Sequence, residues 1–149
     1  VSVNDPEIVK LAKEIVGNEN NVVKAAELIR RKVNRMILTI AGIVFFRDST
    51  EILETKEGVC RDHAILSARL MRSVGIPTRL ASGIVHMQGR FFYHAWVEVY
   101  DGKRWVGFDS TRTQPVLSVT HIKIASGSIS ETFTSFLLDG ATIEVVGEE

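Results

Sequence analysis

Cysteine is nearly absent from this chain, since Cys60 is the only one among 149 residues. A single cysteine cannot form an intrachain disulfide, and it excludes a zinc site built from several cysteines. A lone cysteine is more often a small buried apolar residue than a nucleophile. The residues around Cys60 therefore decide how it is interpreted.

The chain also lacks an excess of charge, because Lys plus Arg and Asp plus Glu both number 18. This balance argues against a nucleic-acid partner, which normally meets a basic surface. The longest apolar stretch, residues 36–46, is interrupted by Thr39 and is too short to cross a bilayer, and no signal peptide is visible at the start. We therefore expect no membrane contact from this segment, and we slightly favour the cytoplasm for it.

The remaining composition is that of a globular domain, with 45% apolar and 24% charged residues. A chain of this length fits one domain with one core. We expect a helical part over residues 1–57, a central part over 58–111 and additional strands over 112–149. The first residue is Val rather than Met, which is compatible with a domain of a longer protein.

Helical periodicity characterises the first half of the chain. Asp5 followed by Pro6 is a typical helix start, and apolar residues at helical spacing continue to Gly17. A second helix is predicted from about residue 21 to 36, whereas residues 38–46 are ambiguous between helix and strand. A third helix is predicted to begin at or just before Cys60 and to end at Gly75.

Strand-forming residues characterise the second half. Asp101-Gly102, between two such runs, predicts a two-residue hairpin. Helices followed by antiparallel strands indicate an α+β domain. The predicted strands are residues 78–86, 92–100, 103–109, 117–125 and 142–146.

The predicted position of Cys60 favours reactivity. At a helix N-terminus the helix dipole lowers the pKa of a thiol and favours the thiolate. The backbone N–H of Cys60 would also be free to act as an oxyanion donor. A buried structural cysteine could equally lie in the middle of a helix.

His94 lies in a strand with period-two alternation. It shares a face with Trp96 and Glu98, while Ala95 and Val97 belong to an apolar face. A histidine on a polar face is commonly just exposed to solvent. The functional alternative is a general base that takes the proton of the thiol.

Asp109 follows the next predicted strand. If Tyr100 pairs with Lys103 across a two-residue turn, counting along both strands places Asp109 directly opposite His94. A carboxylate there could orient the imidazole and stabilise its charged form. The alternative is a strand-end aspartate that caps the residues after it.

Several motifs resemble the core of the transglutaminase-like superfamily, in its order and rough spacing. They are Gly58-Val59-Cys60-Arg61-Asp62-His63-Ala64, Gly75-Ile76-Pro77-Thr78-Arg79, the run from His94 to Tyr100, Trp105, and Asp109-Ser110-Thr111. The resemblance implies a papain-like arrangement with Cys60 as nucleophile, His94 as base and Asp109 as orienting acid. It also implies a cysteine-bearing helix packed on an antiparallel sheet.

The chain departs from the family pattern at three points. Ser110 stands where the family often has Pro, and no Trp precedes Cys60 to stabilise an oxyanion as in animal transglutaminases. No acidic loop replaces their calcium sites, so we expect neither a metal nor another cofactor. The chain looks more like the compact microbial and archaeal members.

Other residues are weaker candidates. Tyr93, Trp96 and Trp105 could line a substrate groove beside His94, although core packing is the commoner role for such aromatics. The remaining histidines are less favoured for a direct catalytic part, and a metal site built from them is less favoured still. They are His63, His86 and His121.

The resulting expectation is an enzyme that acts on a protein or peptide substrate. A Cys60 thiolate would attack a peptide or glutamine amide, and we favour hydrolysis over transamidation because the chain is short for a second-substrate tunnel. A peptide-linked glycan amide is a further possible substrate. The alternatives are a catalytically inactive binding module and a regulatory piece of a longer chain.

Overall fold

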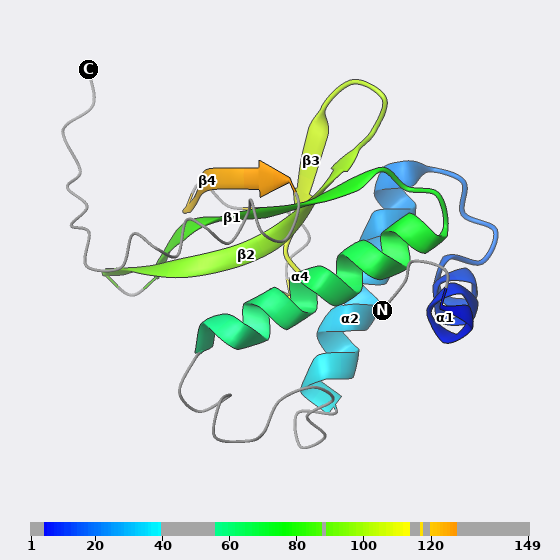
Figure 1. Cartoon of the computed structure of the whole chain (residues 1–149), viewed down its shortest axis with the longest axis horizontal. Coiled ribbons are helices and arrows are strands. Elements are labelled where there is room, and N and C mark those ends of the chain that lie inside the picture. Colours follow the sequence, from blue (N-terminus) through cyan, green and yellow to red (C-terminus); the bar gives the residue numbers. More distant parts are fainter. Residues whose placement is uncertain (1–4, 40–55, 88, 114–116, 118–119, 128–149) are drawn as a thin grey trace.

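A computed structural model of the chain describes residues 5–39, 56–87, 89–113, 117 and 120–127. Within these residues, three helices precede four strands in the sequence (Figure 1). The expected α+β class is confirmed, and the expected strand at 142–146 and the ambiguous stretch 40–46 lie outside the described residues. The elements are α1 (Pro6–Val16), α2 (Val22–Thr39), α4 (Lys56–Ser73), β1 (Thr78–Met87), β2 (Arg90–Tyr100), β3 (Trp105–Phe108) and β4 (His121–Gly127).

Capping side chains mark the starts of the first two helices. The Asp5 carboxylate accepts a hydrogen bond from the N–H of Glu7, and the Asn21 side chain accepts one from Lys24. Gly17, with a φ of 58°, ends α1. Within the described residues, no helix is long and apolar enough to cross a membrane.

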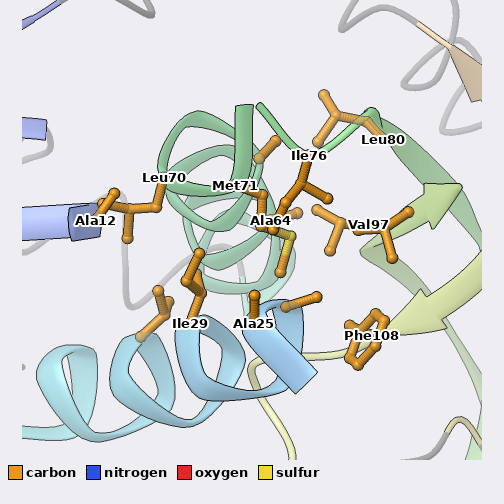
Figure 2. Close-up of a cluster of buried hydrophobic side chains, with 14 of the residues drawn as sticks. Ala12, Ala25, Ile29, Ala64, Leu70, Met71, Ile76, Leu80, Val97 and Phe108 are labelled. Carbon is orange, nitrogen blue, oxygen red and sulfur yellow. The ribbon is translucent and has the colours of Figure 1, made fainter. Parts of the chain in front are cut away.

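The sheet is antiparallel throughout, in the order β3-β2-β1-β4. Helix α4 packs against β2 and β1, and α1 and α2 pack against α4 (Figure 1). Buried side chains from the three described helices and from β1, β2 and β3 meet in one apolar cluster, which includes Ala12, Ile29, Ala64, Leu70, Met71, Leu80, Val97 and Phe108 (Figure 2). This core fixes α4 against the middle of the sheet.

Helix α4 begins earlier than predicted. Its first residue is Lys56, so Cys60 is the fifth residue of the helix rather than the first. Only the first four N–H groups of an α-helix lack an intrahelical acceptor. The predicted free N–H of Cys60, and its role as an oxyanion donor, therefore do not hold, and the dipole effect at Cys60 is weaker than expected.

The hairpin between β2 and β3 also differs from the prediction. Tyr100 pairs with Trp105 rather than with Lys103, so the connection has four residues instead of two. The Asp101 carboxylate stabilises it by accepting hydrogen bonds from the N–H groups of Lys103 and Arg104. The predicted register is therefore wrong by two residues, and Asp109 is not directly opposite His94. A shift of two keeps every side chain on its predicted face.

Candidate active site

The His94 ring and the Asp109 carboxylate form a direct contact. Nε2 of His94 lies 2.7 Å from Oδ2 of Asp109. An ionised carboxylate can only accept, so the ring nitrogen is the donor. The contact leaves Nδ1 of His94 as the nitrogen that could exchange a proton with another group. The structure thus brings together two of the three residues singled out in the sequence.

Both oxygens of Asp109 accept hydrogen bonds. Oδ1 accepts from the backbone N–H of Thr111 at 3.0 Å and from its hydroxyl at 2.6 Å. Oδ2 accepts from His94 and also from Nε2 of His121, at 2.9 Å. Nε of Arg112 lies 3.7 Å from the same oxygen. The carboxylate is almost fully buried, and its partners compensate for the loss of water.

These contacts keep Asp109 ionised. Burial by itself would raise the pKa of Asp109. The hydrogen bonds from His121 and His94, the positive charge that His94 can carry and the Thr111 hydroxyl act in the opposite direction. Together they prevail, and the pKa of Asp109 lies well below its ordinary value. Asp109 is therefore suited to stabilise a positively charged imidazole.

The segment after β3 is tied to the helices. The Ser67 and Ser110 hydroxyls lie 3.0 Å apart, and the Asn34 amide donates to the Ser110 carbonyl at 2.9 Å. One guanidinium nitrogen of Arg30 donates to the carbonyl of Arg112 at 2.5 Å. Since β3 ends opposite Val97, this segment rather than a strand lies beside the part of β2 that carries His94. Helices α2 and α4 therefore hold Asp109 in place.

His63 connects α4 with the His94–Asp109 pair. Its side chain is buried, and burial lowers its pKa to about 4, with a further contribution from His94. The Asp109 charge and a backbone hydrogen bond to Ser110 oppose this shift. Nδ1 of His63 has no hydrogen-bond partner in the described part of the chain, so Nε2 makes the contact with Ser110. The charge interactions place this turn of α4 next to the pair.

Cys60 lies one turn before His63 on the same side of α4. Its side chain is 4% exposed and belongs to the apolar core cluster. The core residues of β2, such as Ala95 and Val97, face the helices, whereas His94 points to the other face of the strand. Cys60 and His94 could therefore meet only around the edge of β2, at the part of the strand that does not pair with β3.

His121 is a member of the site that sequence reasoning held as a weak candidate. It begins β4, which pairs with β1, so its approach to Asp109 depends on a pairing between distant segments. Its ring is edge-on to the Trp96 ring, with centroids 5.3 Å apart. The signal in the sequence was limited to a histidine in a late strand with the same alternation as His94.

In the structure, Trp96 lies near His94 and Trp105 lies far from it. Trp96 is buried and stacks near His94, with ring centroids 6.3 Å apart. Trp105 lies beside Tyr100, six residues along β2 from His94, which corresponds to about 20 Å of strand. An Arg79 guanidinium covers it, 4.0 Å from the ring centroid. The structure therefore does not bring Trp105 to His94, and the side chain of Tyr93 is outside the described residues.

Three side chains of the site could in principle hold a metal. The ligand atoms of His94, Asp109 and His121 all lie within 4.8 Å of one another. Hydrogen bonds already account for this closeness, because both ring N–H groups point at one carboxylate oxygen. A metal would have to displace both protons.

Comparison with known proteins agrees with the fold. The family description "Transglutaminase-like superfamily" matches residues 9–110, which is more than half of the chain. The chain belongs to the transglutaminase-like superfamily. At the level of this family, the match supports thiol-dependent enzyme chemistry.

Two relatives extend the comparison. An uncharacterised protein of Mycobacterium leprae is 34% identical over 101 residues, which covers 60% of this chain and 34% of that protein. A crystal structure from Cytophaga hutchinsonii, provisionally assigned as a cysteine protease, matches with a TM-score of 0.59 and 28% identity. That match covers 82% of this chain and 42% of the other. The chain thus spans less than half the length of either relative.

Proposed function

We propose that this domain is a cysteine hydrolase of peptide or glutamine amides, with Cys60 as nucleophile, His94 as base and Asp109 as the orienting acid. The observation that carries the proposal is the 2.7 Å contact between His94 Nε2 and the buried Asp109 carboxylate. Family membership and the provisional protease assignment of the Cytophaga hutchinsonii protein support the same class. The turn of α4 that follows Cys60 adjoins the pair through His63.

The reaction would use Nδ1 of His94, because Asp109 occupies Nε2. His94 takes the thiol proton, and the sulfur of Cys60 forms a bond to the amide carbon. The C–N bond then breaks, His94 gives its proton to the leaving amine or ammonia, and a thioester remains. In the second half His94 takes a proton from water and a C–O bond forms. The C–S bond then breaks to release the acid, and His94 gives its proton back to the sulfur of Cys60. Asp109 stabilises the positively charged imidazole in both halves.

Transamidation uses the same three residues, with an amine in place of water. Ammonia release from a glutamine peptide, measured with and without a primary amine such as dansylcadaverine, separates the two outcomes. We expect ammonia release without the amine and little incorporation of the dye. Incorporation that exceeds hydrolysis would instead identify an acyltransferase.

Alkylation of Cys60 is the direct test of the triad. Because the chain has one cysteine, any incorporated iodoacetamide reports on Cys60 alone. A free thiol with a pKa of about 8.5 is less than about 1% thiolate at pH 6, so a thiolate paired with His94 should react far faster. We expect His94→Ala to slow alkylation at pH 6 by about two orders of magnitude, measured by mass spectrometry over time.

The control for this test is His86→Ala, because His86 is an exposed histidine on β1. This variant should alkylate like the parent chain. If both variants follow the titration of an ordinary thiol, the triad is not formed and the hydrolase proposal fails.

A catalytically inactive binding module is the second candidate. The observation that favours it is the burial of Cys60, which is 4% exposed among apolar neighbours. A purely structural cysteine should react slowly at every pH, and it should become reactive only in urea. Rapid labelling of the native chain would exclude this reading.

A further inference from the structure

His121 makes a contact that the proposed triad does not require. Its side chain is 4% exposed, and its Nε2 lies 2.9 Å from Oδ2 of Asp109, the oxygen that also accepts from His94. The ionised carboxylate has no hydrogen to give, so His121 must carry a proton on Nε2 to make this contact. One carboxylate oxygen is therefore shared by two imidazole N–H donors.

The backbone of β1 brings β4 close enough for this contact. Gly83 pairs with His94 on one side and with Lys123 of β4 on the other, at a break in the register. A Cβ atom at Gly83 would lie 1.9 Å from the carbonyl oxygen of Ile122, so a side chain there would push β4 away. Glycine thus permits the close approach of β4 to the strand that stands next to His94.

Two titratable groups lie next to His121 in the described part of the chain. They are Asp109 and His94, whose ring centroid is 5.7 Å from that of His121. Arg112 approaches the same carboxylate from the segment after β3, and His63 acts on it from α4. Lys123, on the same strand as His121, is held by both oxygens of Glu98. The Asp109 carboxylate is therefore the acceptor to which the Nε2–H of His121 is directed.

We propose that His121 is a positioning residue that acts on the reaction through Asp109. His121 holds Oδ2 by a second hydrogen bond, so the carboxylate keeps its orientation while the charge on His94 changes during the reaction. Trp96 supports this role, because its ring packs against the His121 ring in a nearly perpendicular contact, at 88°. The inference rests on the proposed function, since it presumes that His94 is the base.

Two substitutions at the same position test this role. Gln can place an N–H group near the position of Nε2, whereas Leu retains bulk and removes the donor. We expect His121→Leu to slow alkylation of Cys60 at pH 6 by about tenfold, the effect of losing one hydrogen bond to a charged group, and to move the midpoint of its pH profile upward. His121→Gln should restore the rate to within about twofold of the parent chain. Equal rates for the Leu variant and the parent chain, with the fold intact by circular dichroism, would overturn the inference.

A measurement on the unmodified chain guards against variants that fail to fold. The four histidines can be labelled with nitrogen-15 and assigned by single substitutions. We expect the Nε2-protonated tautomer for His121, with slow exchange of its N–H. A His121 ring protonated only on Nδ1 could not donate to Asp109, and that result would refute the role.

The two proposals fail in different ways. If His94→Ala leaves alkylation unchanged, the proposed function fails and the inference loses its basis. If His94→Ala slows alkylation but His121→Leu does not, only the positioning role of His121 is refuted.

Discussion

Asp109 carries the largest number of functional contacts of any side chain in the site. Four donor groups on three residues occupy its two oxygens, and burial separates it from water. A carboxylate held in this way keeps both its charge and its orientation. The same arrangement makes the pair sensitive to the loss of any one donor.

His63 gives the domain a pH dependence of its own. Burial lowers its pKa from 6.5 to about 4, so the unfolded chain binds more protons than the folded chain between these values. The free energy of unfolding should therefore be highest above pH 6.5 and fall by about 3 kcal/mol as the pH drops toward 4. Thermal unfolding followed by circular dichroism from pH 7 to 4 measures this loss.

The matched variants are His63→Gln and His86→Gln. Gln at position 63 can still donate to Ser110 but cannot take up a proton, so we expect a flatter dependence of the unfolding temperature on pH. The exposed His86 should leave the dependence as it is. An unchanged slope in His63→Gln would show that other groups cause the loss.

At the scale of elements, α2 holds the segment that carries Asp109. Arg30 is 2% exposed, binds Glu27 through two contacts of 2.6 Å and donates to the carbonyl of Arg112. The side chain of its neighbour Arg31 is 53% exposed, and its contact with the same glutamate is longer, at 3.8 Å. The two arginines thus differ in burial while sharing a partner.

This difference predicts unequal effects of the same substitution. Arg30→Met should lower the free energy of unfolding by about 2–3 kcal/mol, because it leaves Glu27 and the Arg112 carbonyl without a donor. Arg31→Met should change it by less than about 0.5 kcal/mol. Urea titrations of both variants test the comparison, and equal losses would mean that the link to Arg112 contributes nothing.

The strands show which features of the fold and the site could be predicted from the sequence and which could not. His94 and Asp109 were expected together because the predicted two-residue hairpin placed them opposite each other. That register was wrong by two residues, but a shift of two keeps each side chain on its face, so the two residues still meet. The length of the turn was wrong, since Asp101 organises four residues rather than two. The approach of His121 was not foreseen because it depends on the pairing of β4 with β1, which no local pattern specifies. The predicted start of α4 was also wrong, because the helix begins at Lys56 and not at or just before Cys60.

At the scale of the whole molecule, the apolar core joins all three helices to β1, β2 and β3. A shared core of this kind should make helices and sheet unfold together. Whether helices and sheet unfold in a single transition therefore tests the expectation that the chain forms one domain.

Two optical probes report on different parts of the core. Both tryptophans, Trp96 and Trp105, are on the sheet, whereas the circular dichroism at 222 nm comes mainly from the helices. We expect their urea transitions to coincide within error. A helical signal that persists after the fluorescence has changed would indicate two separate folding units.

The links that hold the segment 109–112 have an implication for the order of events during synthesis. They join residues separated by 82, 76 and 43 positions, and β4 is added after all of them in the sequence. Contacts between such distant positions form late, because long loops must close first. Cys60 would therefore leave the ribosome well before its base is held in place. A nascent or partly folded chain should carry a thiol of ordinary reactivity, and under the proposed function its activity would begin only once β4 has docked.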